Sequence, residues 1–122
     1  MHQYLRVTKS ADFAAARREG ASCSNGLLVL IARANGLDAT RFGFSVGKRV
    51  GNAVVRNKIK RSLREIARVT PVEGGWDLVV IARKGSSSAN FQTLTRSMAA
   101  LLKRAQVLET SSERVSLPAG AE

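Results

Sequence analysis

The sequence predicts one mixed α/β domain whose elements follow the order helix, strands, helix, strand, helix. The runs 27–32 and 76–82 are almost entirely apolar and have the length of strands that lie inside a sheet. Apolar residues recur at spacings of three and four, as in helices with one buried face, in 52–69 and 90–107. A chain of 122 residues, 44% of them hydrophobic, can bury one ordinary core, so a single domain is expected.

Local signals place the elements of the first half. Ser10 can cap a helix that ends at Gly20, and Asp12 suits the first turn of that helix. Asn35-Gly36 favours a hairpin turn between two strands. The strands expected around this turn, and one short strand before them, lie at 21–25, 27–32 and 41–46.

The second half is predicted in the same way. Asn52 is expected to cap a long helix that ends before Pro71, because the residue before a proline disfavours helical conformation. The last helix begins near Asn90, and its apolar face is formed by Phe91, Leu94, Met98, Leu101 and Leu102. We therefore expect one domain over 1–108 and a disordered polar tail over 109–122.

Positive charge is abundant and concentrated. The chain has 20 Lys and Arg against 9 Asp and Glu, for a formal net charge of +11. Between Arg41 and Arg68 lie nine basic residues and one acidic residue, Glu65, so about a quarter of the chain carries most of the net charge. Holding like charges close together costs folding free energy unless a partner neutralises them. The charge pattern therefore indicates a binding site for a polyanion rather than a merely solvated face.

Several classes of protein are disfavoured. The longest apolar run is far shorter than the roughly 20 residues that cross a bilayer, and the N-terminus lacks the apolar core of a signal peptide. The single cysteine, Cys23, can form no internal disulfide, which favours a cytoplasmic protein without a membrane partner. A self-sufficient nuclease needs clustered carboxylates or an acid–base pair, and the acidic residues here are few and scattered.

The helix at 52–69 concentrates the basic residues on one side. Its packing stripe is expected to consist of Val55, Ile59, Leu63 and Ile66. Beside this stripe, at positions about one turn apart, the polar arc contains Arg56, Asn57, Lys60, Arg61, Arg64 and Arg68. Guanidinium and ammonium groups at this spacing suit the phosphates of a nucleic-acid strand, and Asn57 can bond base edges or 2′-hydroxyls. Glu65 is expected to pair with Arg61, and Lys48 and Arg49 extend the basic patch into the preceding loop.

Residues 41–65 read R-F-G-F-S-V-G-K-R-V-G-N-A-V-V-R-N-K-I-K-R-S-L-R-E. This segment resembles the bacterial ribonuclease P protein family, in which a strand like R-x-G-F-S-V leads through a basic loop and G-N-A into R-N-R-x-K-R-x-x-R-E. Weaker similarity extends over most of the chain. The order and spacing of these residues, in a protein of this size and charge, make the resemblance highly specific.

The resemblance implies a two-layer α/β sandwich of order α-β-β-β-α-β-α. It implies a four-stranded mixed sheet and a left-handed β-α-β crossover, which ordinary handedness rules would not predict. It also implies the protein subunit of an endoribonuclease whose catalytic RNA carries out the chemistry and removes the 5′ leader of precursor tRNA. The expected partners are this RNA and precursor tRNA, with no obligate protein partner. Magnesium ions would be bound mainly through the RNA.

By resemblance, two sets of residues meet RNA. The catalytic RNA would be bound by Lys48, Arg49, Arg56, Asn57, Lys58, Lys60, Arg61, Arg64 and Arg68, with Asn57 near an RNA-bound magnesium ion. The leader would lie in a cleft between the first helix and the sheet, against Lys9, Phe13, Arg17 and Ile31. Lys58 replaces the last arginine of R-N-R, and Arg17 and Ile31 stand where aromatic residues are common. The leader cleft is therefore expected to be less aromatic and more electrostatic.

Two rival functions agree with the composition. The first is a non-enzymatic ribosomal or structural RNA-binding protein, against which the 41–65 segment argues. The second is a DNA-binding protein that places its basic helix in a major groove. No dimer element or short-turn helix pair supports this second function.

Overall fold

The computed structural model describes residues 5–6 and 10–106. Its helices are α1 (Ser10–Glu19), α2 (Ala53–Val69) and α3 (Phe91–Arg104). Its strands are β1 (Leu5–Arg6), β2 (Ala21–Ser24), β3 (Leu28–Ala34), β4 (Arg41–Val46) and β5 (Trp76–Ala82). Short 3-10 helices, η1 (Lys48–Val50) and η2 (Lys84–Ser88), follow β4 and β5. The predicted order is confirmed, and the two-residue β1 is an addition to it. The tail expected at 109–122 lies outside the described residues.

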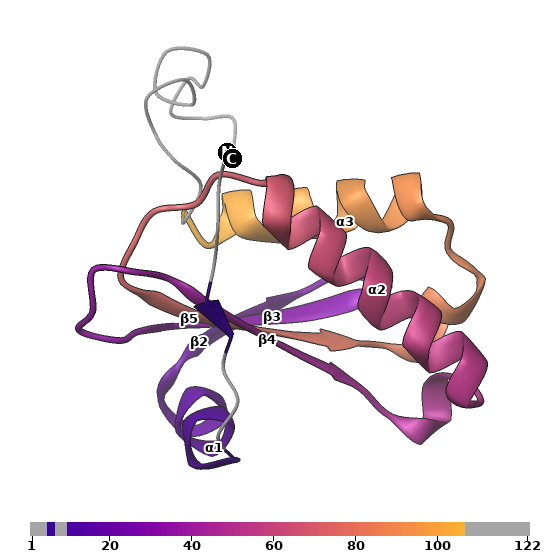
Figure 1. The fold of residues 1–122 in the computed structure, drawn as a ribbon, viewed down its shortest axis with the longest axis horizontal. Helices are drawn as coiled ribbons and strands as arrows, with labels where there is room; N and C mark the ends of the chain where they lie inside the picture. The colour runs from indigo at the N-terminus through magenta and orange to yellow at the C-terminus, as the bar shows by residue number, and fades with distance from the viewer. Residues whose placement is uncertain (1–4, 7–9, 107–122) are drawn as a thin grey trace.

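The strands form one mixed sheet in the order β1-β4-β5-β3-β2. Strand β3 is antiparallel to both of its neighbours, whereas β4 and β5 are parallel and are joined through α2. Viewed from the side of α2 with β4 pointing upward, β5 lies to the left of β4, so this crossover is left-handed (Figure 1). The expected mixed sheet and its crossover are therefore present.

The main core lies between the sheet and the layer formed by α2 and α3 (Figure 1). Alternate residues of β3, β4 and β5 point into it, as strand geometry requires, and meet Ile59, Leu63 and Ile66 of α2. Phe42 and Phe44 share this face of β4, and their rings stack with centroids 5.9 Å apart. The expected packing stripe of α2 is confirmed, with Val55 partly buried at its start.

Helix α1 covers the opposite face of the sheet over a much smaller apolar contact (Figure 1). Ala16, Ile31 and Val79 are buried there, and Phe13 packs at the margin. The close approach depends on Gly20, because a Cβ at this position would lie 2.5 Å from Cγ2 of Ile31. This second face of the sheet is therefore only partly covered.

The caps follow the sequence closely, whereas one predicted hairpin does not form. The Asn52 side chain accepts the Val55 N–H at 3.0 Å, and Asn90 accepts the Thr93 N–H at 2.8 Å, so both expected caps are confirmed. Gly36 has a φ of +74°, so the chain turns there as predicted. The predicted hairpin is wrong, because β5 lies between β3 and β4 and these two strands do not pair. Phe91 differs from the expectation: it is 46% exposed, whereas the other four residues of the α3 face are at most 2% exposed.

Candidate nucleic-acid interface

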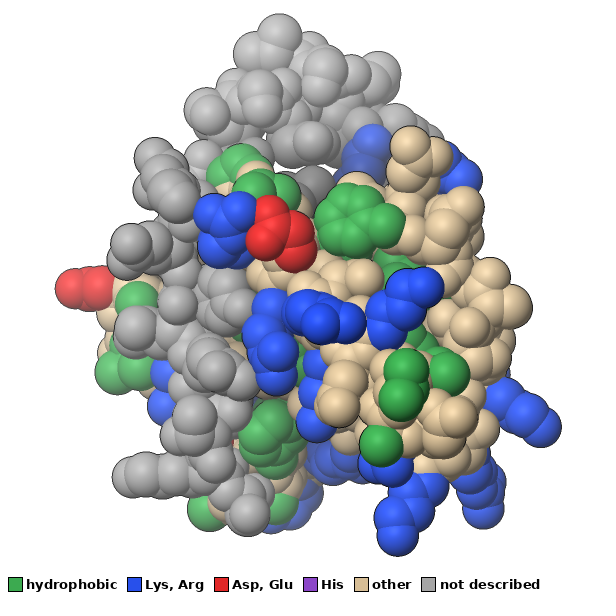
Figure 2. Space-filling view, turned by 45° about the vertical axis from the view of Figure 1, so that its right-hand side comes forward, with side chains coloured by type: hydrophobic (Ala, Val, Ile, Leu, Met, Phe, Trp, Pro, Cys, Tyr) green, Lys and Arg blue, Asp and Glu red, His purple; other side chains and the backbone are tan. Residues whose placement is uncertain are grey.

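Helix α2 presents cations to solvent because its apolar stripe is committed to the core. Asn57, Lys58, Arg61 and Arg68 are exposed. The remaining cations of the helix are half-buried along one flank, namely Arg56, Lys60 and Arg64. Figure 2 shows Lys and Arg side chains over the centre and the lower edge of this face, where acidic side chains are few. The predicted basic surface therefore exists in three dimensions.

Intramolecular contacts prearrange only part of this surface. The Nε of Arg56 donates a hydrogen bond to the Gly51 carbonyl at 3.1 Å, which fixes the arginine beside the loop. Glu65 pairs with Arg68, not with Arg61 as expected, because the i,i+3 geometry brings their side chains together. The hydrogen bond from Arg68 lowers the pKa of Glu65. Within the described part of the chain no residue pairs with Arg61, so its guanidinium is available to a partner.

The loops after β4 and β5 form a second basic site. Lys48 and Arg49 on one loop, and Arg83 and Lys84 on the other, line a hollow of about 560 Å³. Sequence reasoning missed Arg83 and Lys84. They could have been found, since they follow the strand 76–82 and the carboxyl ends of parallel strands meet at one edge of a sheet. The hollow also contains Ile81, whose side chain lies on the face covered by α1, so the basic surface continues from α2 to that face.

The residues expected to contact the leader differ in how far they are buried. Phe13 is half-buried and Arg17 is exposed, one turn apart on α1. Ile31 is only 7% exposed beneath α1, so it serves packing and offers little surface to a ligand. Lys9 lies outside the described residues. The partly exposed apolar residues near Phe13 on this face are Val29 and Ile81, which sequence reasoning did not single out.

A polar cluster ties α1 to the sheet. The fully buried carboxylate of Asp77 accepts hydrogen bonds from Arg41 at 2.8 and 2.6 Å and from Asn35 at 3.0 Å. Burial by itself raises the pKa of Asp77, but these hydrogen bonds and the nearby positive charges outweigh it and lower the pKa. Arg41 also reaches Asp12 on α1 at 3.4 Å. A second arginine of the sheet bridges Asp77 to the other end of α1, where the salt bridge from Arg33 to Glu19 measures 2.8 Å.

Metal ligands are sparse in the described ranges. Within residues 5–6 and 10–106, no three His, Cys, Asp or Glu side chains lie close enough together to hold a metal ion. The described helices also include none with the length and apolar character of a membrane span.

The fold and the site together define a small basic protein of the nucleic-acid-binding class, built on a mixed sheet with a cationic helix across one face. Comparison with known proteins makes this class specific. The family model described as Ribonuclease P matches residues 1–106. The chain belongs to the ribonuclease P protein family.

Relatives and solved structures agree with this assignment. A ribonuclease P protein component from Clostridium kluyveri is 43% identical over 104 residues, which cover 82% of this chain and 93% of that protein. One from Dehalococcoides mccartyi is 36% identical over 95% of this chain and 97% of its own length. The RNase P protein structure from Staphylococcus aureus matches with a TM-score of 0.81 and 35% identity, over 88% of this chain and 100% of that one. The RNase P protein structure from Thermotoga maritima matches with a TM-score of 0.73 and 39% identity, over 81% of this chain and 96% of that one.

The family fixes the general role. The chain is the protein subunit of the ribonucleoprotein that removes the 5′ leader of tRNA by endonucleolytic cleavage, and its partner is the ribonuclease P RNA. The rival interpretation as an unrelated structural RNA-binding protein is not favoured.

Proposed function

We propose that α2 and the Lys48–Arg49 loop bind the catalytic RNA, while the face of the sheet beside α1 binds the leader of precursor tRNA. The exposed row of cations on α2 is the observation that carries this proposal. Side chains one helical turn apart lie about 5–6 Å from one another, a spacing that suits successive phosphates. Arginine grips a phosphate through two N–H groups, and lysine acts as a point charge.

The leader side of the proposal rests on a different chemistry. Phe13 offers part of a ring and Arg17 an exposed cation on the same side of α1. A single-stranded leader presents unstacked bases and phosphates, which such a pair can hold with little regard to sequence. Half-buried Val29 and Ile81 supply the apolar floor in place of buried Ile31.

Magnesium ions belong to the proposal as partners of the RNA. The family's reaction implies them, and hard oxygen donors suit Mg²⁺ best. On α2 the exposed Asn57 carries a neutral amide oxygen among cations. This oxygen can accept a hydrogen bond from a water molecule that is bound to a magnesium ion held by RNA phosphates. The cations around it orient the phosphates that would carry the metal. We also propose that the protein acts in the cytoplasm.

The test is reconstitution of the full chain with a bacterial ribonuclease P RNA at low magnesium, followed by cleavage of precursor tRNA. We expect faster cleavage than with RNA alone. Arg61→Ala should weaken association with the catalytic RNA and reduce the slope of log affinity against log salt by about 1, because one phosphate contact is lost. Arg96→Ala is the matched control, since Arg96 is an exposed arginine on α3. An unchanged slope for Arg61→Ala would place this side chain away from phosphate.

A further inference from the structure

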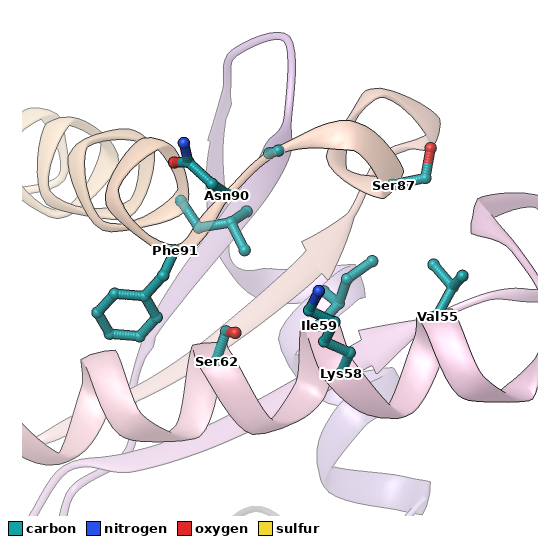
Figure 3. A pocket seen from close by; sticks show the side chains of 9 residues that line it. Val55, Lys58, Ile59, Ser62, Ser87, Asn90 and Phe91 are labelled. Atoms are coloured by element: carbon teal, nitrogen blue, oxygen red, sulfur yellow. The ribbon is translucent and has the colours of Figure 1, made fainter.

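A groove runs between α2 and the start of α3, on the face of the sheet opposite α1. Its volume is about 230 Å³, below the roughly 300–1,000 Å³ of pockets for drug-sized ligands. Residues of both helices and of η2 line it, and Figure 3 shows them facing one another. A groove of this size suits one small planar group rather than a larger ligand.

One wall of the groove is an aromatic side chain that is not buried in the core. Phe91 is 46% exposed, although it begins a helix whose other apolar residues are buried. It lies across from Ser62 of α2, as Figure 3 shows. The floor is apolar, because Ile59 and Leu94 are buried beneath it. An exposed ring above an apolar floor is the surface on which an unpaired base stacks.

Charge at the groove comes from Lys58. Helical geometry places Lys58 and Ser62, four residues apart, on the flank of α2 that faces α3, and both line the groove. Arg56, Lys60 and Arg64 lie on the opposite flank of the helix. Lys58 therefore connects the cationic surface of α2 to the groove, a role that its place in the R-N-K sequence did not reveal.

We propose that this groove binds one unpaired nucleotide of the catalytic RNA, with its base against Phe91 and its phosphate on Lys58. The inference rests on the proposed function of α2. Continuity with the cationic surface and the positive charge at the rim favour RNA. The position favours the catalytic RNA over the precursor, because the proposed leader surface lies on the other face of the sheet.

Polar groups at the rim can read the edge of the base. Ser62 and Ser87 carry hydroxyls that both donate and accept hydrogen bonds. The Asn90 Oδ1 is occupied as the cap of α3, which leaves its amide nitrogen as a donor. These groups, with the apolar floor, distinguish the groove from a purely electrostatic phosphate site.

The experiment uses the full chain and the catalytic RNA alone, without precursor tRNA. Affinity and the 2′-hydroxyl reactivity of each RNA nucleotide are measured for the wild type, Phe91→Ala, Phe91→Leu and Leu37→Ala. Leu37 is the matched control, because it is 48% exposed in the loop between β3 and β4. We expect Phe91→Ala to weaken binding about tenfold, since base stacking is lost, and Phe91→Leu to restore only part of it. Leu37→Ala should bind like the wild type.

The reactivity data locate the nucleotide. One unpaired nucleotide should be protected by the wild type and by Leu37→Ala but reactive with Phe91→Ala, and Lys58→Gln should weaken the same protection. Equal affinity and equal protection for Phe91→Ala and Leu37→Ala would overturn the inference while leaving the α2 interface standing. An effect of Phe91→Ala that appears only when precursor tRNA is added would also overturn it. Failure of the wild type to bind the RNA would instead refute the proposed function.

Discussion

The Asp77→Asn substitution tests how α1 is held on the sheet. It removes the negative charge from a side chain that is fully buried and receives hydrogen bonds from Arg41 and Asn35. Removing one partner of a buried charge pair costs about 3–5 kcal/mol. Arg41 is 22% exposed and keeps Asp12 as a second partner. We therefore expect the free energy of unfolding to fall by about 2–3 kcal/mol, which lowers Tm by roughly 10 °C.

The assay is urea unfolding with thermal unfolding as a second probe. Glu65→Gln is the control, because it removes the same charge from an exposed pair and should leave Tm unchanged within error. The functional readouts should separate: affinity for leader-bearing precursor should fall with the loosened α1, whereas affinity for the catalytic RNA alone should not. A loss of stability no larger than that of Glu65→Gln would refute the reasoning that the cluster around Asp77 fastens α1.

The pH dependence of this variant follows from the lowered pKa of Asp77. A carboxylate with a lowered pKa stabilises the fold above its unfolded pKa of about 3.9, and loses this contribution as the pH falls through the folded-state pKa. The difference in stability between the wild type and Asp77→Asn should therefore be constant from about pH 5 to 7 and shrink below about pH 4. A difference that grows as the pH falls would show that the carboxylate is not the stabilising group.

Three further substitutions test separate parts of the structure. Phe13→Ala should weaken binding of leader-bearing precursor more than binding of mature tRNA, and Phe13→Leu is the packing control. Equal effects on both RNAs would assign Phe13 to the core. Gly20→Ala should lower the free energy of unfolding by about 1–3 kcal/mol, because the Cβ of the alanine would clash with Ile31. Urea unfolding measures this loss. Asn52→Ala should cost about 1 kcal/mol through the lost cap of α2, and an unchanged urea midpoint would contradict that role.

Much of the fold could be predicted because local chemistry determines it. The caps at Asn52 and Asn90 and the turn at Gly36 depend on neighbouring residues alone, and all three are present. The hairpin expected at this turn is absent, because β5, from the second half of the chain, inserts between β3 and β4. The handedness of the crossover could not be derived from local patterns, because the usual preference is the opposite. It came from the resemblance of the 41–65 segment. The two-residue β1 is too short to leave a periodic pattern.

The site was predictable where periodicity determines it and missed where tertiary packing does. The cationic row of α2 follows from helical spacing. Burial of Ile31 depends on how α1 lies on the sheet, and exposure of Phe91 depends on the distance between two helices, so neither follows from the pattern of its own element. Glu65 forms its salt bridge with Arg68 and not with Arg61, although both arginines lie within reach on the helix. The side-chain rotamers decide between the two.

The attachment of α1 has a consequence for how salt experiments on this protein are interpreted. Apolar contact beneath this helix is small, and the salt bridges from Arg33 to Glu19 and from Arg41 to Asp12 are partly open to solvent. Such pairs are screened over a Debye length of about 8 Å at physiological ionic strength. On the proposed leader surface, added salt is therefore expected to act twice, by displacing the leader from the cations and by relaxing the helix that carries Phe13. We expect the slope of log leader affinity against log salt to be steeper than the phosphate contacts alone would give, and we expect no such excess for the catalytic RNA on α2.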